Sequence, residues 1–204
     1  MFLHRIQMST EISLKFTILG EYYVGKTSLI GRFIDGVFDK TYSATIGFNF
    51  LSKNVVYEGQ NYTLNIWDTS GSEKHRAVSP NYYRGTDGCI LVYDVTNKHT
   101  IEALSYWYSE FVSSVSTTNS DEIPTLLIGN KVDLEHDEEA IELANDFARC
   151  NDIKEHLLVS ALDGKNVDEA FFKLLGLCAK NQIAQCKSVL KLDDKVENHE
   201  SGCC

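Results

Sequence analysis

The chain has too little positive charge for a protein that coats nucleic acid. Its 204 residues include 19 Lys and Arg against 29 Asp and Glu, which gives a formal net charge of −10. Such a surface has no excess of cations with which to displace counterions from a phosphate backbone. Nucleic acid is therefore excluded as a general partner.

Long apolar runs are also missing. The longest stretches, residues 88–93 and 123–128, have the length of a strand. A helix needs about 20 apolar residues to cross a bilayer, so we expect no transmembrane helix. The N-terminal segment MFLHRIQMST contains no apolar run long enough for a signal peptide. These features predict a cytoplasmic protein.

The six cysteines include no pair with the spacing of a metal site. In a cytoplasmic protein, scattered thiols are most simply core residues. We therefore expect Cys89, Cys150 and Cys178 to be buried or nearly buried. Cys203 and Cys204 end the sequence and need a separate explanation.

Strand-like and helix-like stretches alternate along the chain, which is the pattern of an α/β fold. Residues 47–68 hold two strand-like runs around Glu58, Gly59 and Gln60, so we expect a hairpin that adds one antiparallel strand to a mostly parallel sheet. Helices are expected on both faces of this mixed sheet. Further strands are predicted at 13–20, 88–96, 123–130 and 156–161, and helices from about Lys26 and at 101–115, 138–149 and 167–180.

Three segments are predicted along the chain. Residues 1–11 form a flexible extension, and residues 12–180 form one α/β domain. Residues 181–204 form a disordered tail, because their apolar periodicity is lost and polar residues dominate. The tail's acidic residues are Asp193, Asp194, Glu197 and Glu200.

Residues 20–27, GEYYVGKT, fit the pattern of a phosphate-binding loop between a strand and a helix. In this arrangement backbone N–H groups and the helix N-terminus face the phosphates. Lys26 would supply a positive charge, and the Thr27 hydroxyl would ligate Mg²⁺. On its own such a segment is also compatible with a glycine-rich turn, but the flanking strand and helix favour the phosphate site.

The segment WDTSG follows the second strand of the predicted hairpin. Asp68 would hold Mg²⁺ through a water molecule, at the end of a strand where open α/β sheets bind ligands. Gly71 would turn its backbone amide toward a γ-phosphate, since glycine tolerates unusual torsions. A strand-terminal aspartate alone is more often a turn or cap residue, so this assignment depends on the phosphate loop upstream.

The segment NKVD, with Asn130, Lys131 and Asp133, follows another apolar strand and points to guanine. A carboxylate only accepts hydrogen bonds, and guanine offers two adjacent donors on its Watson–Crick edge. Adenine would place an acceptor there, which disfavours an ATPase or a P-loop kinase. Ser160 and Ala161 would support the base oxygen. Taken alone, NKVD is also compatible with a loop and a helix cap.

The order of these segments resembles the Ras superfamily of small GTPases, and the Rab family in particular. The resemblance covers roughly residues 12–180 and is strengthened by TIGFNF at 45–50, YYRG at 82–85 and VYDVT at 92–96. It implies the P-loop NTPase fold of small GTPases, a six-stranded mixed sheet with helices on both faces. It also implies GTP or GDP as the bound nucleotide, with Mg²⁺, and a regulator of vesicle trafficking.

The resemblance further implies roles for individual residues. Thr45 would ligate Mg²⁺ from the first switch, Phe38 would pack against the guanine, and residues 72–84 would form the second switch. The nucleotide-binding set would comprise Gly20, Glu21, Tyr22, Tyr23, Val24, Gly25, Lys26, Thr27, Ser28, Phe38, Tyr42, Thr45, Gly71, Asn130, Lys131, Asp133, Ser160, Ala161 and Leu162.

Partners are implied in the same way. Effectors would bind an aromatic surface next to the switches, made of Phe48, Phe50, Trp67, Tyr82 and Tyr83. The alternative is that some of these aromatic side chains belong to the core. An exchange factor, a GTPase activator and a GDP-dissociation inhibitor are also expected.

The sequence departs from the family pattern at the catalytic site, where Gly71, Ser72 and Lys26 are the candidate catalytic residues. Relatives carry a glutamine at the position of Ser72, where it orients the attacking water. A serine side chain is too short for this role, so intrinsic GTP hydrolysis should be slow. The alternative is a GTP-binding scaffold, or pseudo-GTPase, with negligible catalysis.

Two further departures lie beside the nucleotide. Tyr22 and Tyr23 stand where relatives have small residues, with glycine typical at the second position. Their bulk would crowd the γ-phosphate or an incoming activator unless the side chains point outward. Leu162 replaces a lysine whose stem packs on the base, and leucine offers packing without charge.

The terminal Cys203 and Cys204 resemble the doubly geranylgeranylated end of Rab proteins. Two lipids give stable membrane attachment where one gives only marginal binding. This predicts a peripheral protein on the cytosolic face of endomembranes or vesicles. Without such modification the two residues are free thiols.

Overall fold

The computed structural model describes residues 11–38, 48–69, 82–115 and 123–197. The elements in chain order are β1 Ile12–Leu19, α1 Lys26–Asp35, β2 Phe48–Tyr57, β3 Gln60–Thr69, β4 Gly88–Asp94, α2 Lys98–Val115, β5 Thr125–Asn130, α3 Glu138–Cys150, β6 Glu155–Leu158 and α4 Val167–Glu197. Strands and helices alternate after β3, as the sequence predicts.

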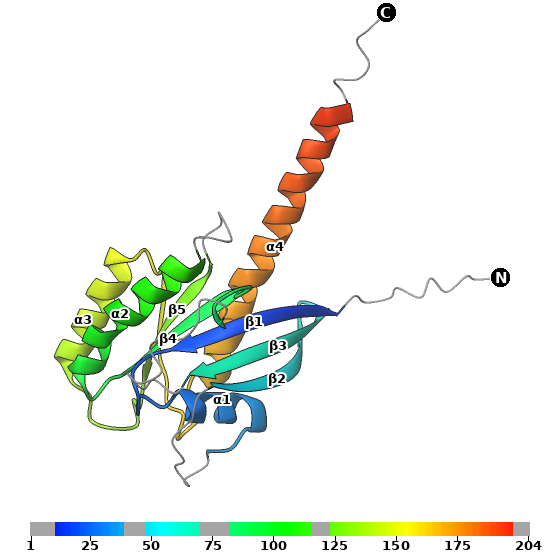
Figure 1. The fold of residues 1–204 in the computed structure, drawn as a ribbon. Coiled ribbons are helices and arrows are strands. Elements are labelled where there is room, and N and C mark those ends of the chain that lie inside the picture. Colours follow the sequence, from blue (N-terminus) through cyan, green and yellow to red (C-terminus); the bar gives the residue numbers. More distant parts are fainter. Residues whose placement is uncertain (1–10, 39–47, 70–81, 116–122, 198–204) are drawn as a thin grey trace, which may run out of the picture.

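The described strands form one six-stranded sheet in the order β2-β3-β1-β4-β5-β6. All neighbouring strands are parallel except β2 and β3, which pair antiparallel at one edge. Helices α2 and α3 cover one face of the sheet, and α1 and α4 cover the other (Figure 1). The predicted mixed sheet with helices on both faces is therefore confirmed.

The predicted hairpin is also present. Tyr57 pairs with Gln60, so the connection is the two-residue turn Glu58-Gly59. Both turn residues have positive φ, 49° at Glu58 and 78° at Gly59. Two positive φ values match the right-handed twist of the flanking strands, which is why such turns suit hairpins.

The core has one hydrophobic layer on each face of the sheet. On the α1 and α4 face, the ring of Phe33 in α1 stacks on Phe171 in α4, with centroids 3.9 Å apart and an interplanar angle of 8°. On the other face, Trp107 and Phe111 of α2 are buried against β4. The first contact is the one that matters for the site, because it fixes α1, the helix that follows the loop 20–27.

Helix α4 is longer than the sequence analysis predicts. We expected a helix over 167–180 followed by a disordered tail from residue 181, but the helix continues to Glu197. Residues 181–197 contain no glycine or proline and include several strong helix formers, so nothing in them ends a helix. Within the described residues, no helix is long and apolar enough to cross a membrane.

The expectation for the cysteines is right for two of three residues. Cys89 and Cys178 are buried, and burial raises the pKa of the Cys178 thiol to about 12. Cys150 is exposed, contrary to the prediction. Helix α3 buries Ala140, Ala144 and Ala148, and a residue two positions after Ala148 lies on the opposite side of the helix.

Candidate functional site

Polar residues follow the carboxyl ends of five neighbouring strands. The loop 20–27 follows β1, and Asp68, Asp94 and Asn130 lie at or near the ends of β3, β4 and β5. Ser160 comes just after β6. Since these five strands are parallel, their carboxyl ends share one edge of the sheet. The topology therefore brings the predicted segments together.

Two glycines let the loop after β1 pack tightly. Gly20 has φ +147°, and a Cβ there would lie 2.2 Å from the carbonyl oxygen of Val92. Gly25 has φ +93°, and a Cβ there would lie 2.4 Å from Nδ2 of Asn130. Neither position has room for a side chain, so the glycines of the motif are required by packing as well as by backbone conformation.

Lys26 is buried beneath this loop. Its ammonium donates hydrogen bonds to the carbonyl oxygens of Gly20 and Glu21, both at 2.9 Å. Burial lowers the pKa of Lys26 to about 8, although the negative charges of Asp68 and Glu21 oppose that shift. Lys26 is also the first residue of α1, whose first turn carries no acidic side chain. The helix N-terminus and the ammonium together favour an anion at this place.

Tyr22 and Tyr23 point into solvent, with 51% and 61% of their surface exposed. Their rings meet edge to face, with centroids 5.1 Å apart. Tyr23 has φ 64°, a left-handed conformation that costs a non-glycine residue about 1–2 kcal/mol. This torsion explains why glycine suits the position, and the outward direction explains how the loop accommodates tyrosine.

Thr27 and Asp68 supply oxygen atoms for a cation. The Thr27 hydroxyl donates to Oδ2 of Asp68 at 2.6 Å, and Asp68 is fully buried at the end of β3. Hydroxyl and carboxylate oxygens fit Mg²⁺, which is usually held by one or two carboxylates together with phosphates and waters. In the described ranges no group of three or more His, Cys, Asp and Glu is arranged for a metal ion. The two oxygen donors, the Thr27 hydroxyl and the Asp68 carboxylate, are of the type that Mg²⁺ prefers.

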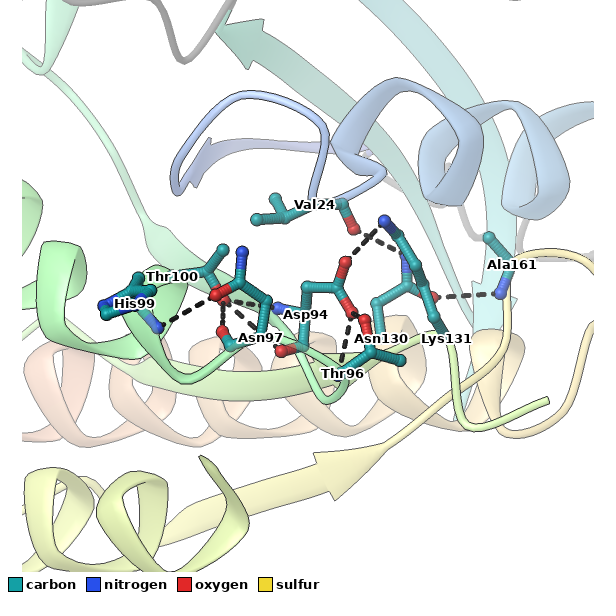
Figure 2. A network of polar contacts seen from close by, with 9 residues as sticks. All are labelled: Val24, Asp94, Thr96, Asn97, His99, Thr100, Asn130, Lys131 and Ala161. Atoms are coloured by element: carbon teal, nitrogen blue, oxygen red, sulfur yellow. Dashed lines mark hydrogen bonds and ion pairs between the residues drawn. The ribbon is translucent and has the colours of Figure 1, made fainter. Parts of the chain in front are cut away.

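Asn130 connects two loops through its side-chain amide (Figure 2). Its Nδ2 donates to the carbonyl oxygen of Val24 at 2.8 Å, and its Oδ1 accepts from the backbone N–H of Ala161 at 3.1 Å. Asn130 itself is buried. The loop after β1 and the loop after β6 are thus held at a fixed separation.

Asp133 is exposed, and Ser160 orients its carboxylate. The hydroxyl of Ser160 donates to Oδ1 of Asp133 at 2.6 Å. The same hydroxyl accepts from the backbone N–H of Asp163 at 3.0 Å. Because Ser160 is fully buried, these two bonds set the direction in which the exposed carboxylate faces.

Asp94 belongs to the site although the sequence analysis gave it no role. Its Oδ2 lies 2.5 Å from Nζ of Lys131, and its Oδ1 accepts from the backbone and the hydroxyl of Thr96 at 2.9 and 2.8 Å (Figure 2). Lys131 has φ 74°, so the residue that Asp94 holds by this ion pair has a left-handed backbone conformation. The signal that could have found Asp94 is its place at the end of β4, in line with Asp68 and Asn130.

The other predicted nucleotide-site residues are distributed as follows. Val24 is buried in the core, Ser28 is half-buried, and Phe38 is partly buried against the core beside α1. Leu162 is 41% exposed beside Ala161. Residues outside the described ranges are Tyr42, Thr45, Gly71, Ser72, Cys203 and Cys204.

The predicted aromatic surface is smaller than expected. Phe50 is 51% exposed and meets the half-buried Trp67 edge to face, with centroids 5.4 Å apart. Tyr82 and Tyr83 are buried, so the prediction that they face partners is wrong. Tyr83 packs against Phe111 of α2, and Tyr82 packs between Trp67 and Tyr83. The side chain of Phe48 lies outside the described residues.

Comparison with known proteins agrees with this geometry. Residues 15–180 match the Ras family. The chain is 39% identical over 170 residues to the Ypt/Rab-type GTPase ypt7 of Schizosaccharomyces pombe, which covers 82% of this chain and 83% of that protein. It is 35% identical over 202 residues to the Ypt/Rab-type GTPase Rab7 of Gibberella zeae, which covers 95% and 97%. It is 35% identical over 198 residues to the Ras-related protein Rab7 of Cenchrus ciliaris, which covers 94% and 96%.

The contrast between two glycines beside the site gives a first prediction. Gly25→Ala should destabilise the protein by at least about 1 kcal/mol, because it adds both a left-handed alanine and a contact with Asn130. Gly31→Ala is the matched control, since Gly31 lies within α1 and a Cβ there meets nothing within 4 Å. The free energy of unfolding of the control variant should rise by up to about 1 kcal/mol, because alanine favours a helix more than glycine does. Urea unfolding measures both, and equal effects would contradict the assigned role of Gly25.

Proposed function

This chain belongs to the Ras family and, within it, to the Rab small GTPases, and on that premise we propose that it is a GTP/GDP switch that recruits effectors to membranes in vesicle trafficking. As a small GTPase it hydrolyses GTP to GDP and phosphate. The observation that carries the proposal is the Asn130 amide, which joins a phosphate-type loop to a base-reading loop.

Guanine recognition is proposed for Asp133 and its neighbours. The carboxylate of Asp133 would accept hydrogen bonds from the two adjacent donors of guanine, and Ser160 holds it in place for them. The backbone of Ser160 and Ala161 would support the base oxygen, and Leu162 would pack on the base. The stem of Lys131, tethered by Asp94, would lie beside the ring.

The phosphates would lie at the N-terminus of α1. Lys26 would exchange its bonds to the loop carbonyls for bonds to phosphate oxygens, which are stronger acceptors because they are charged. Thr27, with Asp68 through a water molecule, would hold Mg²⁺, as would Thr45 in the GTP state. When bound, the metal would supply positive charge that neutralises the phosphate oxygens.

The switch itself would involve residues outside the described ranges. Thr45 and the backbone amide of Gly71 would respond to the γ-phosphate, and hydrolysis would release both segments. The exposed Phe50 and the half-buried Trp67 lie close to these segments in the sequence and would be the aromatic part of the effector surface. An exchange factor, a GTPase activator and a GDP-dissociation inhibitor would set the nucleotide state.

Membrane attachment would come from geranylgeranyl groups on Cys203 and Cys204. The protein would then lie on the cytosolic face of endomembranes or vesicles, as a peripheral protein. This assignment rests on the terminal cysteine pair and on the membership of the chain in the Rab proteins.

Slow intrinsic hydrolysis is part of the proposal. Ser72 stands where relatives carry the glutamine that orients water. Tyr22 and Tyr23 add bulk at the mouth of the phosphate loop, where an activator would approach. The protein would therefore remain in the GTP state longer than its relatives do.

Base selectivity tests the core of the proposal. Excess GDP should displace a fluorescent guanine nucleotide from the protein, and ADP should be at least about 100-fold weaker, because adenine leaves the Asp133 carboxylate facing an acceptor. Asp133→Asn should lose most of this preference. Asp146→Asn is the matched control on the exposed surface of α3. Equal displacement by ADP and GDP would exclude a guanine-specific site.

Single-turnover hydrolysis tests the slow step. GTP loaded on the protein with Mg²⁺ should be hydrolysed slowly, and Ser72→Gln should accelerate the reaction about tenfold or more, as restoring one hydrogen bond in the transition state would. Tyr23→Gly reports the effect of the tyrosine, and Tyr106→Ala, another exposed tyrosine, serves as its control. If the native rate already matches that of ordinary Rab proteins, another residue compensates for Ser72 and the prolonged GTP state is wrong.

The lowered pKa of Lys26 predicts a pH dependence of nucleotide affinity. Below pH 8 the ammonium is charged and attracts phosphate, and bound phosphate would raise its pKa. As pH rises through about 8 the nucleotide-free protein loses this proton, so GDP affinity should fall by up to about fivefold between pH 8 and pH 9 and by up to about tenfold between pH 7 and pH 9. Titrations at pH 7, 8 and 9 measure the fall, and Lys26→Ala reports any titration of the base itself. A flat profile in the native protein would contradict a phosphate contact by Lys26.

A further inference from the structure

Arg32 connects helix α1 to the loop after β6. Its Nε donates to the carbonyl oxygen of Ala161 at 2.9 Å, and its Nη2 donates to the carbonyl oxygen of Leu162. Its Nη1 donates to the carbonyl oxygen of Gly36 at 2.8 Å. One guanidinium thus holds three carbonyls, two of which lie far away in sequence, and it does so from the same helix that begins with Lys26.

Peptide geometry turns these contacts into a constraint on the loop. A trans peptide directs its C=O and the following N–H to opposite sides, and the described chain contains no cis peptide. Holding the Ala161 carbonyl toward α1 directs the N–H of Leu162 away from it. Holding the Leu162 carbonyl likewise directs the N–H of Asp163 away, and this N–H donates to Oγ of Ser160 at 3.0 Å.

A continuous path therefore runs from Arg32 to the base-reading carboxylate. The Asp163 N–H orients the hydroxyl of Ser160, and that hydroxyl donates to Oδ1 of Asp133 at 2.6 Å. Each link is a hydrogen bond or a planar peptide, so displacement of the Leu162 peptide would rotate the group that aims Asp133. The phosphate-binding helix and the base-reading carboxylate are coupled through this path.

We propose that Arg32 is a positioning residue for guanine recognition. This proposal rests on the proposed function. Arg32 acts through the Leu162 peptide and Ser160 to orient the Asp133 carboxylate. It thereby couples this orientation to the position of α1, the helix that carries Lys26 and Thr27. Arginine suits the task because its planar fork reaches several carbonyls at once, whereas a lysine ammonium is a single point.

A role limited to ending helix α1 does not account for these contacts. The helix already ends on Gly36, which has φ 71° and donates its N–H to the carbonyl oxygen of Arg32 at 3.0 Å. That backbone bond satisfies the last turn without the guanidinium. Two of the three guanidinium bonds go instead to residues 161 and 162, beside the predicted base site.

The test compares GDP with IDP, which lacks the 2-amino group of guanine. Competition against a fluorescent guanine nucleotide on the full chain gives the ratio of the two affinities. The native protein should prefer GDP by about tenfold or more, as one hydrogen bond to a carboxylate requires. In Arg32→Lys this ratio should fall at least about threefold. A displaced Asp133 carboxylate would lose the hydrogen bond from the 2-amino group, which GDP has and IDP lacks, so the affinity for GDP would fall more than the affinity for IDP. Arg149→Lys, on the exposed face of α3, is the control and should keep the native ratio.

A purely structural role for Arg32 would weaken GDP and IDP equally, and an unchanged ratio in Arg32→Lys would overturn the proposal. Ser160→Ala breaks the path at its last link and should lower the ratio too, whether or not the Arg32 variants fold. Adding Arg32→Lys to Ser160→Ala should then lower the ratio of GDP to IDP affinity only slightly further. If the effects of the two substitutions on this ratio are fully additive, Arg32 acts by another route. Equal binding of GDP and ADP by the native protein would instead reject the proposed function.

Discussion

The side-chain amide of Asn130 reaches two loops at once, and the geometry of the site depends on that reach. Its nitrogen holds Val24 in the loop after β1, and its oxygen holds Ala161 in the loop after β6. Gly25 must lack a side chain because a Cβ there would meet the same amide. Arg32 also contacts the second loop, through the Ala161 carbonyl. The loop after β6 is therefore held at Ala161 by Asn130 at the end of β5 and by Arg32 in α1, the helix that follows the loop 20–27.

Electrostatics complements this mechanical link. The ammonium of Lys26 is buried, which lowers its pKa, and two loop carbonyls together with the charges of Asp68 and Glu21 offset part of the cost. An anion at the N-terminus of α1 would offset more of that cost, because it brings a full charge to a poorly solvated cation. Burial of Lys26 and the absence of acidic residues in the first turn of α1 thus act in the same direction.

Local sequence patterns were enough to predict the sheet and the hairpin at Glu58 and Gly59. They also predicted the segments that meet at the edge of the sheet. The reason is that strand patterns and motif spacing depend on residues that are close together in the sequence. Contacts between distant segments were not predictable in this way. Asp94 and Arg32 gained their roles from partners that only the fold brings near, and Tyr82 and Tyr83 are buried by aromatic neighbours on α2 and β3. Helix α4 is longer than expected because a loss of apolar periodicity indicates that a helix no longer packs on the core. That loss does not by itself end the helix.

Apart from Leu162 beside the base, the departures of this chain from the family pattern lie on one half of the site. Asn130, Asp133, Ser160 and Ala161 keep the family pattern, and the structure links them by hydrogen bonds. Ser72 and the tyrosine pair alter the half that would act on the γ-phosphate. Tyr23 keeps a left-handed backbone that costs about 1–2 kcal/mol, and its exposed ring gains little burial in return. Backbone strain of this kind occurs often at functional positions. Such a division would leave nucleotide affinity intact while it changes the lifetime of the GTP state.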